Sequence, residues 1–386
     1  MRKICVFTGT RADYGIMSRL IRMIADDPML QLQIIATNMH LSPEFGLTYK
    51  EIEADGFHID KKVEMLLSSD TPSGILKSMG LATIGFADAL EDLKPDLAVV
   101  LGDRYEMLVA AEACLIYKVP IAHLYGGEIT EGAYDDSIRH CITKLSHLHF
   151  TSTEEYRNRV IQLGEAPERV FHVGSLGVNN IRNEEFLTLS ELEDSIKFNL
   201  GEKYLLVTFH PVTLEDSTAA EQCDNLLKAL EELNNEYQLL FTLPNSDTDG
   251  RVIIQKVNEY VSKHPNMAFA ISSLGKKRYY SALKYATAVV GNSSSGLVEA
   301  PSFNIPTLNI GNRQKGRTRG GSVFDVPATL DGIRQGLQTI LSYEFRCKAR
   351  NSLNPYEQEN TLGLIFNTIK NYPLEGLVQK NFYNMK

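Results

Sequence analysis

Acidic side chains crowd into one short stretch of the chain, YGGEITEGAYDDSIRH at residues 125–140. Glu128 follows a Gly-Gly step, and Asp135 and Asp136 come just before Arg139. Neighbouring carboxylates repel and raise one another's pKa, so one of them can stay protonated and act as an acid. The stretch is therefore either a solvated loop in which an aspartate caps a helix, or the acid–base centre of an enzyme.

A second acidic group follows a buried run at VVLGDRYE, residues 99–106. Asp103 and Glu106 loosely match a helix cap, and this stretch alone favours that interpretation. Ligands of open α/β sheets bind at the carboxyl ends of the strands. Because Asp103, Glu128 and Asp135 follow successive predicted strands, one cleft can hold all three, and this convergence favours catalysis.

The first strand is followed by TGTRADYG, which opens a predicted helix. It does not match G-x-G-x-x-G, so the dinucleotide fingerprint is absent. Arg11 beside a helix N-terminus suits a phosphate, and a helix cap by Asp13 is an equally good interpretation.

Histidines occur at two kinds of position. His210 directly follows a strand in VTFHPVT. It can therefore contact a phosphate or a leaving-group oxygen, with a structural role as the alternative. His140 and His147 lie seven residues apart on one predicted helix. We expect these two to be structural.

The most informative pattern is VVGNSSSGLVEAPS, residues 289–302. A strand gives way to Asn292, Ser293 and Ser294, and then to a helix that carries Glu299. Hydroxyls and free amides at a helix N-terminus form a cradle for a diphosphate. Glu299 can accept hydrogen bonds from both ribose hydroxyls, and the basic RQKGR that follows makes a plain serine-rich loop a poorer interpretation.

Short apolar runs alternate with amphipathic stretches along the whole chain, which predicts parallel sheets covered by helices on both faces. The runs are KICVFTG, LQIIATN, DLAVVLGD, PIAHLYGG, LHFTST, VFHVGS, YLLVTFH, QLLFTL, MAFAIS, AVVGNSS and PTLNIG. The helical patterns include Tyr105–Tyr117, Asp136–Ser146, Ala219–Leu233 and Arg251–Lys263. The runs exceed the roughly 10 strands that one open sheet holds, so we predict two Rossmann-like halves.

The acidic stretch Arg182–Lys197 separates two periodic regions. We therefore expect one domain over 1–178 and a second, nucleotide-binding domain over 179–353. The final segment, 354–371, is predicted to be a helix that can cross back onto the first domain.

Composition excludes several classes of protein. A net charge of −9 and a pI of 5.6 argue against nucleic acid as a partner. The five cysteines are scattered without a C-x-x-C pair, which fits a reducing cytoplasm and predicts no zinc site. Neither a signal peptide nor an apolar run near the roughly 18 residues of a membrane span is expected.

Seven motifs in order carry a family resemblance. They are TGTRADYG, LGDRYE, GGEITEGAYDDSIRH, ITKLSHLHFTSTEEYRNRVIQLGE, TFHP, GNSSSGLVEAPS and NIGNRQKGR. Together they resemble the UDP-N-acetylglucosamine 2-epimerases, more narrowly the hydrolysing branch that makes N-acetylmannosamine for sialic acid biosynthesis. The similarity runs from Arg2 to about Tyr343; each motif is weak alone, but the ordered set is specific.

The resemblance implies a GT-B fold, with two Rossmann-like domains facing across a cleft, and a cytoplasmic homodimer or homotetramer that binds a nucleotide sugar and needs no nicotinamide. Because two domains joined by a short connection can hinge, we expect the cleft to close on its substrate. The chain lacks a His/Cys ligand cluster and a dinucleotide fingerprint, so we expect neither a metal nor a redox cofactor. Catalytic roles fall on Asp103, Asp135, Asp136, Arg139 and His210. Nucleotide contacts fall on Arg11, Arg104, Asn245, Ser293, Ser294, Glu299 and Arg313.

The chain departs from the family at one position. Many members carry H-x-E where this chain has His123-Leu124-Tyr125. We assign the missing carboxylate to Glu128, with Tyr125 as the alternative.

The implied reaction removes the C2 proton while UDP leaves C1, and then hydrates the resulting 2-acetamidoglucal. Alternatives are the same reaction on a GDP-linked or 4,6-modified sugar, as in the route to legionaminic acid, and a non-hydrolysing epimerase. A GT-B glycosyltransferase is a weaker alternative because it needs only one catalytic base. A nucleotide-sugar sensor without turnover would not need the acidic cluster.

Overall fold

A computed structural model of the chain describes residues 1–67, 69, 71–131, 133–182, 184–212, 215, 218–233, 236–244 and 250–385. The chain divides into two compact units. Unit 1 comprises residues 1–128, 135–180 and 356–386, and unit 2 comprises 129–134 and 181–355. The boundary expected at residue 178 falls inside helix α7 (Leu176–Ile181), and the short excursion 129–134 belongs to unit 2.

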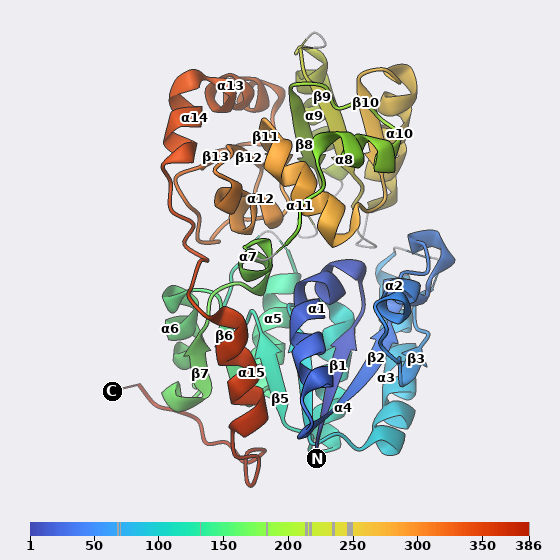
Figure 1. The fold of residues 1–386 in the computed structure, drawn as a ribbon, viewed down its shortest axis with the longest axis vertical. Coiled ribbons are helices and arrows are strands. Elements are labelled where there is room, and N and C mark those ends of the chain that lie inside the picture. The colour runs from blue at the N-terminus through green and yellow to red at the C-terminus, as the bar shows by residue number, and fades with distance from the viewer. Residues whose placement is uncertain are drawn as a thin grey trace. The chain divides into compact units, whose positions relative to one another are not determined.

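Unit 1 is built on a seven-stranded parallel sheet with the order β3-β2-β1-β4-β5-β6-β7 (Figure 1). Its strands are β1 (Arg2–Thr8), β2 (Leu30–Thr37), β3 (Lys61–Val63), β4 (Leu97–Leu101), β5 (Ile121–Leu124), β6 (Leu148–Thr151) and β7 (Val170–His172). The order reverses between β1 and β4, and such a reversal is the usual ligand site of an open α/β sheet.

Helices cover both faces of this sheet because alternate residues of each strand are apolar on both sides. In β1, Ile4 and Val6 pack with α1 and α15, whereas Cys5 and Phe7 pack with α3 and α4. The helices of unit 1 are α1 (Arg11–Asp26), α2 (Tyr49–Ala54), α3 (Pro72–Leu93), α4 (Tyr105–Ile116), α5 (Asp135–Leu145), α6 (Glu154–Gln162), α7 and α15 (Thr361–Asn371).

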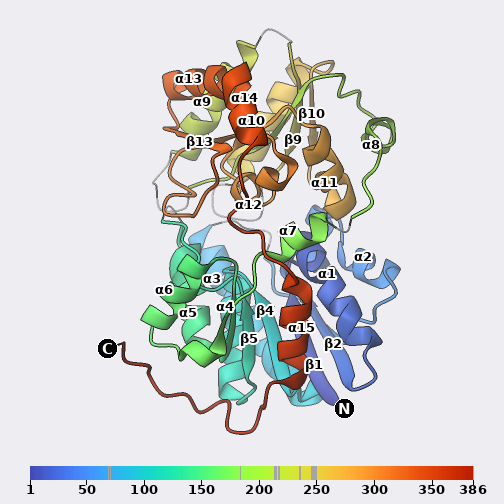
Figure 2. The ribbon, with the colours of Figure 1, turned by 60° about the vertical axis from the view of Figure 1, so that its left-hand side comes forward.

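The C-terminal segment returns to unit 1. Helix α15 packs beside α1, and Arg2 donates a 2.7 Å hydrogen bond to the Ile369 carbonyl (Figure 2). Further on, Lys380 forms a 2.8 Å ion pair with the buried carboxylate of Glu165. The segment therefore completes one face of the unit 1 sheet.

Unit 2 repeats the design with a six-stranded parallel sheet in the order β10-β9-β8-β11-β12-β13. Its strands are β8 (Tyr204–Thr208), β9 (Gln238–Thr242), β10 (Ala268–Ile271), β11 (Ala288–Gly291), β12 (Thr307–Ile310) and β13 (Val323–Val326). Its helices are α8 (Leu189–Ile196), α9 (Ala219–Glu231), α10 (Gly250–Lys263), α11 (Gly275–Tyr285), α12 (Ser295–Val298), α13 (Leu330–Leu341) and α14 (Tyr343–Arg350). The α/β class and the two Rossmann-like parallel sheets are thus confirmed.

Three elements differ from the sequence-based expectation. Strands β3 and β13 are short edge strands with partly exposed side chains, so no continuous apolar run marks them. The acidic stretch 182–197 contains helix α8, which begins with a capping box between Thr188 and Glu191. Its apolar side, including Leu192, packs into the core of unit 2.

Across the described part of the chain, no helix combines the length and the apolar character that a membrane crossing demands.

Candidate active site

A buried arginine organises the acidic residues of unit 1. Arg139, on α5, is 1% exposed and forms ion pairs with the carboxylates of Asp103 and Asp136, the latter at 3.2 Å. It also donates a 2.8 Å hydrogen bond to the backbone carbonyl of Glu128. A buried guanidinium offsets the repulsion between carboxylates and is itself stable only when it is paired. The structure thus joins four predicted catalytic residues in one network, which we call the Arg139 cluster: Asp103, Glu128, Asp136 and Arg139.

Asp103 is not a helix cap, which corrects the interpretation favoured by its own stretch. The cap position of α4 is Arg104, without a side-chain cap bond, and Arg104 instead pairs with buried Glu106 at 2.8 Å. The turn before Asp103 is fixed by the neighbouring strand β5, because His123 donates a 2.8 Å hydrogen bond to the carbonyl of Gly102. Burial lowers the pKa of His123 to about 3, so the ring is neutral. Its Nε2 carries the proton, because a carbonyl only accepts.

Glu128 is buried and hydrogen-bonded from the neighbouring strand. Glu128 is only 4% exposed, and its Oε1 accepts a 2.6 Å hydrogen bond from the Ser152 hydroxyl. Ser152 directly follows β6, so the carboxyl ends of β4, β5 and β6 all contribute to this region.

Tyr125, the alternative to Glu128, is engaged elsewhere in unit 1. It adopts a left-handed backbone conformation with φ 68°. Its hydroxyl lies 2.9 Å from the Ser175 hydroxyl and accepts a 3.1 Å hydrogen bond from the Gly177 amide at the start of α7. The choice of Glu128 over Tyr125 as the replacement for the family's carboxylate stays a prediction.

The two aspartates at the start of α5 differ. Asp136 reaches Arg139, and its other oxygen lies 3.6 Å from Nε2 of His140. Asp135 is half-buried at the first residue of the helix. His147 is structural, as predicted, since its Nδ1 accepts a 3.1 Å hydrogen bond from the Ile121 amide, but it lies beyond the end of α5 rather than on it.

Thr10, and not Asp13, caps α1. The Asp13 carboxylate instead turns back to accept a 2.8 Å hydrogen bond from the Gly9 amide and another from the Thr10 hydroxyl. Burial raises the pKa of Asp13 to about 7. The guanidinium of Arg11 forms a 2.6 Å ion pair with the carboxylate of Glu51.

Unit 2 holds its candidate residues at the ends of β8 and β11, where its strand order reverses. His210 lies two residues beyond β8 and is 6% exposed. Ser293 and Ser294 follow β11 and are half-buried. Arg313 donates a 3.2 Å hydrogen bond to the Asn292 carbonyl, which places its guanidinium beside the serine turn.

The predicted cradle needs one correction. Helix α12 after the serines has only 4 residues, so a helix dipole contributes little there. The side chain of Asn292, just before the serines, is fully buried and paired with the backbone of His210. Glu299 lies at the end of α12 and is 9% exposed. Asn245 falls outside the described residues.

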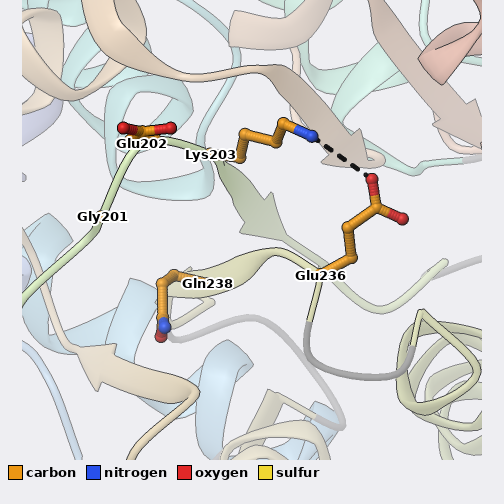
Figure 3. A pocket seen from close by; sticks show the side chains of 5 residues that line it. All are labelled: Gly201, Glu202, Lys203, Glu236 and Gln238. Carbon is orange, nitrogen blue, oxygen red and sulfur yellow. Dashed lines mark hydrogen bonds and ion pairs between the residues drawn. The ribbon is translucent and has the colours of Figure 1, made fainter.

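A shallow hollow in unit 2 lies away from these residues. It has a volume of about 270 Å³ and is lined by Gly201, Glu202, Lys203, Glu236 and Gln238 (Figure 3). These residues precede or begin β8 and β9, so the hollow is at the amino ends of the strands, opposite to His210. Among the described residues, no three His, Cys, Asp or Glu side chains gather as a metal would require.

Sequence reasoning missed three polar residues that support the candidates: His123 as a support, Ser152 and Gln314. Ser152 follows a predicted strand directly, the same signal that identified Asp103. Gln314, fully buried, donates a 2.9 Å hydrogen bond to the Asn292 carbonyl. Nothing in its local sequence indicates that contact.

The family model described as UDP-N-acetylglucosamine 2-epimerase matches residues 22–370. A Campylobacter jejuni protein named GDP/UDP-N,N'-diacetylbacillosamine 2-epimerase (hydrolyzing) is 45% identical, over 100% of this chain and 99% of its own length. The polysialic acid biosynthesis protein P7 of Escherichia coli is 40% identical, over 100% and 98%.

A solved structure shows the same fold. The UDP-GlcNAc 2-epimerase from Neisseria meningitidis, bound to UDP-GlcNAc, superposes with a TM-score of 0.79 at 19% identity, covering 96% of this chain and 99% of that one. The fold is therefore the predicted GT-B fold. The match to the family model and the full-length relatives show that this chain belongs to the UDP-N-acetylglucosamine 2-epimerase family.

Proposed function

We propose that the protein is a hydrolysing UDP-N-acetylglucosamine 2-epimerase, which converts UDP-N-acetylglucosamine and water to N-acetylmannosamine and UDP. The observation that carries the proposal is the Arg139 cluster, in which the carboxylates of Asp103, after β4, and Asp136, on α5, and the backbone carbonyl of Glu128 all contact one buried cation. Such a centre suits a reaction that removes a proton from C2 and later returns one to the opposite face of the same carbon. A glycosyltransferase needs only one base, and a sensor needs none.

In the first step a carboxylate of the cluster takes the C2 proton. The electrons of the C2–H bond form the C1=C2 double bond, and the C1–O bond breaks with its electrons going to the diphosphate. In the second step water adds to the 2-acetamidoglucal, so that C1 gains a hydroxyl and C2 regains a proton on the opposite face. Asp103 and Glu128 share these two proton transfers, one as the base and the other as the acid. Asp135, at the start of α5, is proposed to share in these transfers, and Asp136 pairs with Arg139.

The leaving diphosphate requires cations and hydrogen-bond donors. In unit 2, Ser293, Ser294 and Arg313 supply donors and His210 adds a ring nitrogen, whereas Glu299 accepts from the ribose. Arg11 and Arg104 of unit 1 are the remaining predicted substrate contacts. We infer that unit 1 supplies the residues that act on the sugar and unit 2 those that bind the nucleotide.

A second substrate is favoured by the relatives. Proteins 45% and 35% identical to this chain are named as hydrolysing N,N'-diacetylbacillosamine 2-epimerases, one of them for GDP- and UDP-linked forms. The same acid–base residues would serve that sugar, since the reaction at C1 and C2 is unchanged. The difference lies at C4 and C6, and in the base of the nucleotide.

The test is product analysis by NMR with four substrates: the UDP- and GDP-linked forms of N-acetylglucosamine and of N,N'-diacetylbacillosamine. We expect free N-acetylmannosamine and UDP from UDP-N-acetylglucosamine. Turnover of only the diacetylated sugar would transfer the proposal to the second substrate, and a nucleotide-linked epimer would indicate the non-hydrolysing reaction. Full activity after exhaustive dialysis against EDTA is expected, because no metal takes part in the proposed steps.

The assembly and location remain predictions. We expect a cytoplasmic homodimer or homotetramer. Light scattering of the purified protein would measure the oligomeric state.

A further inference from the structure

The end of the unit 2 sheet has an unusual joint between β8 and β11. These strands run side by side in parallel, with Gly291 opposite Thr208 at their carboxyl ends (Figure 1). Gly291 has φ +136°, and a Cβ there would lie 1.8 Å from the Thr208 carbonyl oxygen. Only glycine allows this approach. The close approach places the next residue, Asn292, beside the backbone of His210, which follows β8.

Asn292 extends the pairing of the two strands with its side chain. Its backbone amide donates a 3.1 Å hydrogen bond to the Thr208 carbonyl. Its Oδ1 then accepts a 2.7 Å hydrogen bond from the His210 amide, and its Nδ2 donates a 2.8 Å hydrogen bond to the His210 carbonyl. The buried backbone of His210, past the last rung of the sheet, thus gains a partner for both of its polar groups.

Only a carboxamide makes this pair of contacts. Asn292 is fully buried, and its two partners fix which end is oxygen and which is nitrogen. An aspartate would set an oxygen against the His210 carbonyl, and a serine is too short to reach both groups. The Asn292 carbonyl is held in turn by Arg313 and Gln314 at 3.2 and 2.9 Å.

We propose that Asn292 is a positioning residue that fixes His210 relative to Ser293, Ser294 and Arg313. The side chain does not itself contact the nucleotide, because both of its polar ends are occupied within the protein. It acts by setting the separation between the histidine that follows β8 and the serine turn that follows β11. This inference rests on the proposed nucleotide site of unit 2 and assigns that site its internal support.

The experiment compares Asn292→Asp and Asn292→Ser with Asn309→Ala. Asn309 is the matched control because it is also buried and lies on the neighbouring strand β12. Its side-chain amide donates a 2.7 Å hydrogen bond to Asp325 and not to His210. Calorimetry with UDP is expected to show affinity about tenfold weaker for both Asn292 variants, the size of one or two lost hydrogen bonds. Asn309→Ala should bind UDP as the wild type does at temperatures where it is folded.

Two further readouts separate positioning from general stability. In protein labelled with ¹³C at histidine, the ring signal of His210, assigned with His210→Gln, should shift in the Asn292 variants and not in Asn309→Ala. In the His210→Ala background, Asn292→Asp should weaken UDP binding by clearly less than it does alone, because one route of the effect is gone.

The outcomes distinguish this inference from the proposed function. A wild-type protein that does not bind UDP would remove the nucleotide site itself, whereas the His210 signal would still report on the Asn292 contact. A folded Asn292→Asp or Asn292→Ser variant with an unshifted His210 signal and wild-type UDP affinity would overturn the positioning role. Equal losses with and without His210 would show that Asn292 acts independently of it.

Discussion

The two units share a parallel-sheet architecture, but their candidate sites contain different chemical groups. In unit 1, the carboxylates of Asp103, after β4, and of Asp136, on α5, both pair with a buried guanidinium. In unit 2, the positions after the strands hold backbone groups, hydroxyls and neutral amides, with Arg313 as a cation at the serine turn. The same region of the fold thus carries different chemical groups in the two units.

The difference follows from the chemistry that each site is proposed to perform. Proton transfer needs groups that change charge, and these are costly to bury unless a counter-charge offsets them, which is the role of Arg139. Binding a diphosphate needs hydrogen-bond donors that are fixed in position. A neutral carboxamide that is hydrogen-bonded to the backbone can be buried at little cost in free energy. Substitutions in unit 1 should therefore affect turnover more than binding, and those in unit 2 the reverse.

The largest effect is expected for Glu128→Gln. Loss of a proton-transferring group should lower kcat by about 10²–10⁴-fold while UDP affinity stays unchanged. Steady-state kinetics and calorimetry measure the two quantities. Glu131→Gln is the control, since Glu131 lies in the same loop and its carboxylate forms an exposed ion pair with Lys315. Wild-type turnover by Glu128→Gln would take this residue out of the proton transfers.

Arg313→Ala should give the opposite pattern. Loss of a charge-assisted hydrogen bond should weaken UDP binding by about 1.5–3 kcal/mol. Turnover at saturating substrate should fall less than it does for Glu128→Gln. Lys315→Ala, two residues away and exposed, should bind UDP normally. An unchanged UDP affinity of Arg313→Ala would remove this residue from the site.

Ser152→Ala tests whether a neighbouring hydroxyl supports Glu128. Loss of one donor to a carboxylate should lower kcat about tenfold, leave UDP affinity intact, and be largely restored in Ser152→Thr. Ser146→Ala, which removes a buried hydroxyl that binds the Ile142 carbonyl, serves as the control. Full activity of Ser152→Ala would mean that Glu128 does not need this contact.

Asp13 makes unit 1 sensitive to pH in a way that unit 2 should not share. Because burial raises its folded pKa from 3.8 to about 7, its stabilising contribution is complete below about pH 4 and is lost as the pH rises through 7. In Asp13→Asn this loss is absent, so the variant should gain stability relative to the wild type between pH 4 and 8. Thermal denaturation across that range measures the difference, and parallel curves would contradict the assignment.

Tyr125→Phe should have the smallest effect on turnover. The hydroxyl binds Ser175 and Gly177, so its loss should cost about 0.5–1.5 kcal/mol of unfolding free energy and leave kcat within about twofold. A dead Tyr125→Phe together with an active Glu128→Gln would reverse the choice between the two residues.

The sequence predicts those parts of the molecule that depend on local pattern. Buried central strands are continuous apolar runs, and polar residues directly after them mark the candidate sites, as Asp103 and His210 show. The edge strands β3 and β13 escape prediction because only one side of each is paired and their side chains are partly exposed.

Contacts between distant residues account for the remaining misses. The ion pair of Arg139 with Asp103 spans 36 residues, and the pairing of Asn292 with His210 spans 82. Local sequence shows the residue types in both cases but not their partners. For that reason the stretch around Asp103 alone favours a helix cap, and the partner of the Asn292 side chain is not predicted.

The central claim is that turnover removes the C2 proton and replaces it from solvent, and the most direct test is the reaction of the wild-type enzyme in D₂O. ¹H NMR of the products from UDP-N-acetylglucosamine should show free N-acetylmannosamine that carries deuterium at C2, together with UDP. The C2 proton must leave in the elimination and is replaced from solvent in the hydration. A free sugar that retains the original C2 hydrogen would contradict the account.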